Sequence, residues 1–138
     1  MAIFGIGAYY DEDVSEQFIE NSIAGPGWSQ EKAPELFQYM SSLKVGDIVY
    51  IKSCPASSKD IHVKGIGFVA DHKLLTESED TKDLVSAGRR INWINTEKFT
   101  IPKPQEKNNV RSNTMYEEFH PEIQKIIMAK VIGAVKNT

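Results

Sequence analysis

The residue whose type and setting most suggest chemistry is a tryptophan in a short loop. Trp28 follows the turn Gly25-Pro26-Gly27 and precedes Ser29 at the entry of a polar segment. An indole in a loop is costly unless it packs or stacks, and stacking on an aromatic side chain contributes about 1–3 kcal/mol per base. Two interpretations follow: Trp28 closes one end of a strand scaffold, or its ring is a platform for a flat ligand.

A second tryptophan, Trp93, lies in the run Ile91-Asn92-Trp93-Ile94-Asn95, which is typical of a strand. Strand alternation places Trp93 on the same face as Ile91, and this favours a place in the core. The alternative is that Trp93, or Tyr10, forms the second wall of a slot that begins at Trp28.

Polar residues near these rings have the right chemistry to bind the edge of a base or a phosphate. The candidates for the base edge are Ser29, Lys52, Ser53 and Asn95. Basic residues that could contact a nucleic-acid backbone are Arg89, Arg90, Lys98 and Lys103. The alternative for these four is a solvated strand edge, where charge prevents aggregation.

Catalytic and metal chemistry has weaker support. Cys54 and His62 flank a predicted hairpin loop, so a thiolate–imidazole pair is conceivable, but an ordinary loop thiol is the favoured interpretation. His62, His72 and His120 lack the spacing of a metal site. We therefore expect a protein that is not an enzyme and that has no metal and no cofactor.

Hydrophobic periodicity indicates the elements that must position these residues. A strand is expected over Ile3 to Tyr10, and an amphipathic helix from Asp13 to Ile23, ended by the Gly-Pro-Gly turn. A second helix of about three turns is expected from Pro34 to Leu43. Further strands are predicted after Val45 up to Ser53, at Ile61 to Asp71, at Arg89 to Asn95 and at Lys98 to Ile101.

The end of the chain is predicted to be helical. Pro121 opens a helix that Gly133 stops, although the last residues could instead form a closing strand. Residues 105–113 are polar and are expected to form a loop. Because the central strands follow one another without helices between them, the fold class is α+β, a small curved antiparallel β-barrel with flanking helices.

Composition sets wider bounds on the protein. The chain has 138 residues and a net charge of −3, which fits a single domain over residues 1–138. Residues 1–40 carry one base and seven acids, whereas residues 84–114 carry six bases and two acids. Bulk charge alone is therefore not expected to hold the protein on nucleic acid.

The expected compartment is the cytoplasm. The first residues lack the pattern of a secretory signal, and no apolar run reaches the roughly 18 residues of a membrane span. The single cysteine suits a reducing environment. No membrane partner is expected.

Several motifs, in this order, resemble the EVE branch of the PUA-like superfamily. They are Gly27-Trp28-Ser29, Ser41-Ser42-Leu43-Lys44, the run from Val45 to Ser53 (VGDIVYIKS), Lys64 to Val69 (KGIGFV), and Asn92-Trp93-Ile94. The similarity covers residues 25–99 and is strongest to the base-reading modules of modification-dependent restriction proteins. It implies a PUA-like barrel whose pocket accepts a flipped, often modified base between aromatic side chains.

Three functions are compatible with these observations. The first is a non-enzymatic module that binds DNA or RNA with a modified base, with any cleavage supplied by an effector protein. The second is a protein-interaction accessory module related to phage or defence systems. The third is a small PUA-like hydrolase acting on a nucleoside or amide.

Overall fold

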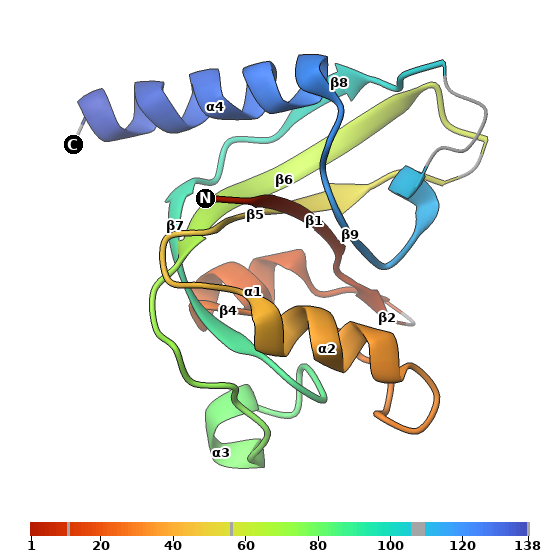
Figure 1. The fold of residues 1–138 in the computed structure, drawn as a ribbon, viewed down its shortest axis with the longest axis vertical. Coiled ribbons are helices and arrows are strands. Elements are labelled where there is room, and N and C mark those ends of the chain that lie inside the picture. The colour runs from red at the N-terminus through yellow and green to blue at the C-terminus, as the bar shows by residue number, and fades with distance from the viewer. Residues whose placement is uncertain (11, 56, 106–109, 138) are drawn as a thin grey trace.

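The computed structural model describes residues 1–10, 12–55, 57–105 and 110–137 (Figure 1). The elements are β1 (Ile3–Gly7), β2 (Tyr9–Tyr10), β3 (Glu12–Asp13), α1 (Ser15–Glu20), β4 (Ile23–Ala24), α2 (Pro34–Ser42), β5 (Ile48–Ser53), β6 (Asp60–Val69), α3 (Ser78–Thr81), β7 (Arg89–Asn95), β8 (Phe99–Pro102), the 3₁₀ turn η1 (Val110–Ser112), β9 (Met115–Glu117) and α4 (Pro121–Lys136).

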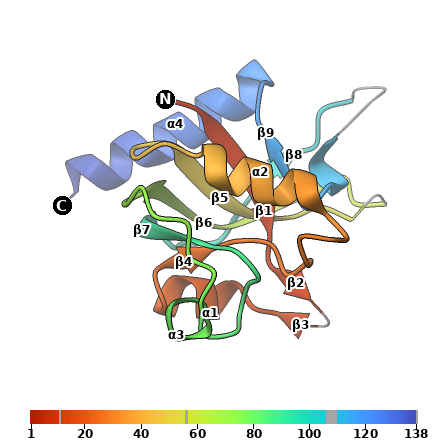
Figure 2. The same ribbon diagram turned by 60° about the horizontal axis from the view of Figure 1, so that its bottom comes forward.

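Within these described ranges, seven strands form one curled sheet in the order β4-β7-β6-β5-β1-β9, with β8 pairing the first half of β6. The sheet has the shape of a half-barrel (Figure 2). The predicted α+β class and the curvature are therefore confirmed. The prediction of a purely antiparallel sheet is wrong, because β1 pairs β5 in parallel. The chain between these strands includes α1 and α2, and a parallel pair needs such a long crossover.

Helices cover both faces of the sheet, with α4 on one side and α1 and α2 on the other (Figure 1). A hydrophobic core lies on each face of the sheet, and alternate residues of the central strands pack into one core or the other. Ile48 and Tyr50 of β5 face α4, while Val49 and Ile51 face the other helices. This alternation is the reason that strand β5 reads as a continuous apolar run.

Two glycines allow neighbouring chains to approach closely. A Cβ atom on Gly67 in β6 would lie 2.7 Å from the carbonyl oxygen of Asn92 in β7. A Cβ atom on Gly5 in β1 would lie 2.5 Å from the ring of Tyr116 in β9. The missing side chain at Gly5 therefore leaves room for the ring of Tyr116.

Several predicted boundaries were wrong. The first strand ends at Gly7, and Ile23 belongs to β4 instead of the first helix. Helix α4 continues through Gly133 to Lys136, so neither a stop at that glycine nor a closing strand is present. Burial of Ile127 and Val131 against the sheet outweighs the roughly 1 kcal/mol that a glycine costs inside a helix. Strand β9 lies next to the predicted loop and was not predicted.

Candidate functional site

A cavity of about 470 Å³ opens where β1 and β5 end, and we call it the basic hollow. Two exposed aromatic side chains line it: Tyr9 is 71% exposed and Trp28 is 51% exposed. Its other lining residues are Gly7, Ala8, Lys52, Ser53, Cys54, Pro55, Lys64, Ser112 and Thr114. The hollow thus combines flat rings with two lysines.

The loop that carries Trp28 is held through its main chain. A Cβ atom on Gly25 would lie 1.9 Å from the carbonyl oxygen of Ala87, so only glycine fits there. The Pro26 carbonyl accepts a hydrogen bond from the Ser86 amide at 2.9 Å, and the Ser86 hydroxyl donates to the Trp28 carbonyl. These main-chain contacts position the loop, and they leave the indole of Trp28 accessible.

Lys52 places a buried ammonium group at the hollow. The pairing of β5 with β6 shifts register between Ile51 and Lys52, and such a bulge re-aims the side chain that follows. Lys52 is 6% exposed, its Nζ donates to the Asn113 carbonyl, and it lies 5.6 Å from the centre of the Tyr116 ring. Burial lowers the pKa of Lys52 to about 8, although interaction with Cys54 opposes the shift.

The second lysine of the hollow already has a counter-charge. Lys64 lies 2.6 Å from the carboxylate of Asp13. Burial alone would raise the pKa of Asp13, but hydrogen bonds from Lys64 and Ser15 lower it to about 2. Within the described part of the chain, Lys52 has no carboxylate partner, so it is the uncompensated cation of the hollow.

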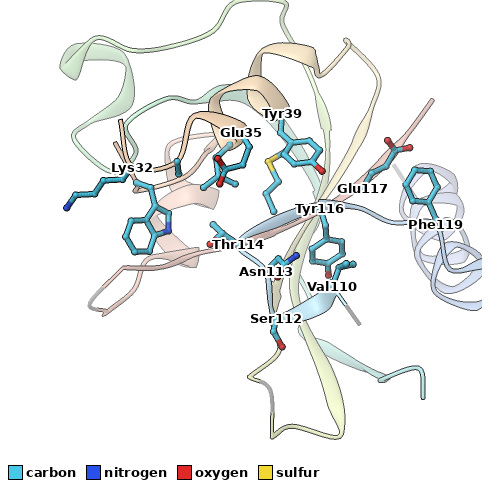
Figure 3. A pocket seen from close by; sticks show the side chains of 14 residues that line it. Lys32, Glu35, Tyr39, Val110, Ser112, Asn113, Thr114, Tyr116, Glu117 and Phe119 are labelled. Carbon is cyan, nitrogen blue, oxygen red and sulfur yellow. The ribbon is translucent and has the colours of Figure 1, made fainter. Parts of the chain in front are cut away.

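A larger cavity of about 830 Å³ adjoins the hollow, and we call it the aromatic groove (Figure 3). It runs between α2 and the segment from η1 to β9. Tyr39 and Phe119 line it, and Phe119 is 72% exposed. Trp28, Ser112 and Thr114 line both cavities, so the indole lies where they meet.

A buried polar cluster holds β9 against the sheet. The hydroxyl groups of Tyr50 and Tyr116 lie 2.8 Å apart, and Tyr50 donates to Glu118 at 2.7 Å. Arg111 forms a buried ion pair with the same carboxylate. Burial raises the pKa of Tyr50 and of Tyr116 above the ordinary tyrosine value. This cluster fixes the segment that separates the two cavities.

The structure brings together three of the predicted base-binding residues: Trp28, Lys52 and Ser53. It separates Trp93 from them. The indole nitrogen of Trp93 donates to the Phe18 carbonyl at 3.0 Å, and the ring packs on the core that faces α1. The predicted slot between two tryptophans is therefore absent from the described cavities, and the core interpretation of Trp93 is confirmed.

The other predicted contacts of this group lie elsewhere. Ser29 is exposed before α2, where its hydroxyl accepts from the Lys32 amide at 3.4 Å. Asn95 accepts from the Glu97 amide at 3.0 Å at the end of β7. Neither side chain lines the basic hollow. The side chain of Tyr10 lies outside what the structure describes.

Arg89, predicted to contact a nucleic-acid backbone, is instead a structural residue. It is 1% exposed, and its guanidinium donates to the carbonyls of Met40 and Leu43 at 2.7 Å and of Asp71 at 2.8 Å. The first two carbonyls end α2, so a buried cation caps the helix. Such a side chain has no surface to offer a phosphate.

The remaining basic candidates are dispersed. Arg90 donates to the Asn21 carbonyl at 3.3 Å and lies 4.0 Å from Asp80. Lys98 is exposed and lines a cavity of about 400 Å³ that shares Ser53 and Lys64 with the basic hollow. Lys103 is partly buried, and its amide donates to the Lys59 carbonyl at 3.0 Å. None of the three lines the basic hollow.

The catalytic alternative receives little geometric support. Cys54 is buried and lines the basic hollow, whereas His62 is exposed and lines the neighbouring cavity that contains Lys98, so neither of these two cavities is lined by both residues. Among the described residues, no group of three or more His, Cys, Asp or Glu side chains could hold a metal ion.

Sequence reasoning missed Tyr9 and Thr114. The strand was expected to run unbroken from Ile3 to Tyr10, whereas it ends before Ala8 and a hairpin of β2 with β3 follows, which carries Tyr9. Thr114 directly precedes β9. This strand has only three residues, which is too short a pattern to predict from the sequence.

Comparison with known proteins gives no family for this chain. No protein-family model matches it, and no curated protein matches it. Among the described helices, none has both the length and the apolar character to cross a bilayer. A function must therefore be argued from the geometry of the two cavities.

Proposed function

We propose that this protein is a non-enzymatic module that binds a single unstacked base of DNA or RNA in the basic hollow. The observation that carries the proposal is the half-exposed indole of Trp28 beside the buried ammonium of Lys52. The ring offers a stacking face, and the ammonium offers hydrogen-bond donors to the edge or substituent of the base.

The energetics are compatible with this role. Extruding a base costs a few kcal/mol, least when the base is damaged, mismatched or already single-stranded. Stacking on Trp28, with further contact from Tyr9, returns about 1–3 kcal/mol per base. A net charge of −3 weakens non-specific attraction to phosphates, so binding depends on the hollow more than on bulk charge.

The PUA-like assignment belongs to the same proposal. The curled sheet with helices on both faces supports it, as do the motifs around Trp28 and Lys52. On this assignment the partner is nucleic acid with a modified base, a separate effector protein supplies any cleavage, and the module acts in the cytoplasm.

The experiment uses the two tryptophans of the chain. Trp93→Phe leaves Trp28 as the only indole, so stacking of a base should quench its fluorescence in a saturable way. The ligands are oligonucleotides with cytosine, methylcytosine, hydroxymethylcytosine, adenine or methyladenine at one position. Trp28→Ala should abolish binding measured with labelled oligonucleotides, while Trp93→Phe retains it. Unchanged binding by Trp28→Ala would refute the stacking role.

A second candidate function is supported by β9, which is the last strand of the sheet that the described residues form. The Gly7 amide donates to the Thr114 carbonyl at 2.8 Å, and the Glu118 amide donates to the Ile3 carbonyl at 2.7 Å. By strand alternation, the main-chain groups of Met115 and Glu117 point away from β1. Both residues line the aromatic groove, so an extended peptide could add a strand there.

The chemistry of the groove defines that peptide. Tyr39 and Phe119 offer contacts for apolar side chains, while Glu35 and Glu117 favour a basic residue. A peptide library should yield extended, basic and apolar sequences whose binding is lost in Phe119→Ser. Ile132→Ser, an exposed apolar site on α4, is the matched control. Selected peptides that bind Phe119→Ser equally well would exclude this function.

A further inference from the structure

We infer that the basic hollow selects bases that present a keto oxygen over bases that present an amino group at the same ring position. The inference rests on the proposed base-binding function and concerns the residues at the inner end of the hollow. It is carried by the kinds of hydrogen-bonding groups that line the cavity.

Lys52 supplies donors and no acceptor. Its ammonium has three N–H groups, and one of them is used by the Asn113 carbonyl. The other two remain for a ligand, because no carboxylate pairs with Lys52 among the described residues. A lysine in this position matches a keto oxygen such as the O6 of guanine.

Strong acceptors are scarce in the same cavity. No carboxylate is among the described residues that line the cavity, so its side-chain acceptors are the hydroxyl groups of Tyr9, Ser53, Ser112 and Thr114. The nearby carbonyls of Thr114, Cys54 and Asn113 already accept one hydrogen bond each, from the Gly7 amide, the Ser112 hydroxyl and Lys52, and each keeps a second lone pair. An amino group placed beside Lys52 would set its N–H donors against an ammonium that has no lone pair to accept them, whereas a keto oxygen in the same place would accept from it.

The depth of Lys52 favours a base over a backbone phosphate. Lys52 is more than nine-tenths buried, with its Nζ over the ring of Tyr116, whereas Tyr9 and Trp28, which line the same cavity, are exposed. A base that stacks on Trp28 can extend its edge into this space. In a continuous strand, by contrast, the phosphate groups lie outside the cavity when the base is stacked on Trp28.

The test compares oligonucleotides that differ at one nucleotide by a keto-for-amino exchange. Uracil replaces cytosine in one pair, and hypoxanthine replaces adenine in the other. For the wild-type protein, we expect the keto member of each pair to bind about tenfold more tightly. In Lys52→Met the ratio should fall to about one, while Lys125→Met, an exposed substitution on α4, should retain it.

The outcomes separate this inference from the proposed function. Binding that depends on Trp28 but is equal for both members of each pair would overturn the keto preference and leave base binding intact. No binding of any oligonucleotide would remove both. If excess inorganic phosphate displaces the oligonucleotide from wild-type protein but not from Lys52→Met, Lys52 binds phosphate and the inference is wrong.

Discussion

Replacing Lys52 by methionine should change how the stability of the protein depends on pH. The pKa of Lys52 is about 8 in the folded protein and 10.5 as its ordinary value, because burial disfavours the ammonium. Between these two values the unfolded chain holds more protons than the folded one. Raising the pH through this window therefore stabilises the folded wild-type protein.

The size of the effect follows from the shift. Each pKa unit corresponds to 1.36 kcal/mol, so the lowered pKa of Lys52 amounts to about 3 kcal/mol of destabilisation near neutral pH. Lys52→Met lacks this titration. The free energy of unfolding of wild type, relative to Lys52→Met, should therefore rise by about 3 kcal/mol between pH 7 and pH 11.

The assay is urea unfolding followed by circular dichroism at several pH values, with both proteins measured in the same buffers. Tyrosines and the remaining lysines titrate in both proteins and cancel in the difference. Lys125→Met, at an exposed site, is the control, and its difference from wild type should stay within about 0.5 kcal/mol. A pH-independent difference for Lys52→Met would mean that the ammonium remains hydrated, and the description of the hollow would be wrong.

Four further substitutions, in two pairs, test the packing of the fold. Gly5→Ala should lower the free energy of unfolding by about 1–3 kcal/mol in urea titrations, because the new methyl group meets the ring of Tyr116; Gly133→Ala, with open space around its Cβ, should raise it by about 0.5–1 kcal/mol. A gain in Gly5→Ala would contradict the packing at Gly5, and a loss in Gly133→Ala would contradict the open space around Gly133. Arg89→Gln should lower the melting temperature and cost about 3 kcal/mol, since three carbonyls lose a charged donor. Arg90→Gln, the matched control near the surface, should change stability by less than about 1 kcal/mol, and an equal loss in both variants would remove the capping role of Arg89.

Local patterns were enough to predict the long elements. The apolar spacing after Pro34 marks α2, and the β-branched run before Ser53 marks β5, because each pattern extends over several residues. The spacing of Ile91 and Trp93 also predicted their common face, which the structure confirms. Short elements such as β9 lacked this repetition and depended on long-range pairing.

The candidate site was predictable in its residue types and not in its assembly. The sequence by itself determined that an indole follows a rigid glycine–proline turn and that a lysine ends a strand. Only the tertiary structure decided which cations are buried: Arg89 caps α2, Lys64 pairs with Asp13, and Lys52 lacks a counter-charge among its described neighbours. The reason is that the hydration and pairing of a charge depend on segments that are distant in the sequence, such as β9. The spacing of neighbouring residues does not show how such segments pack.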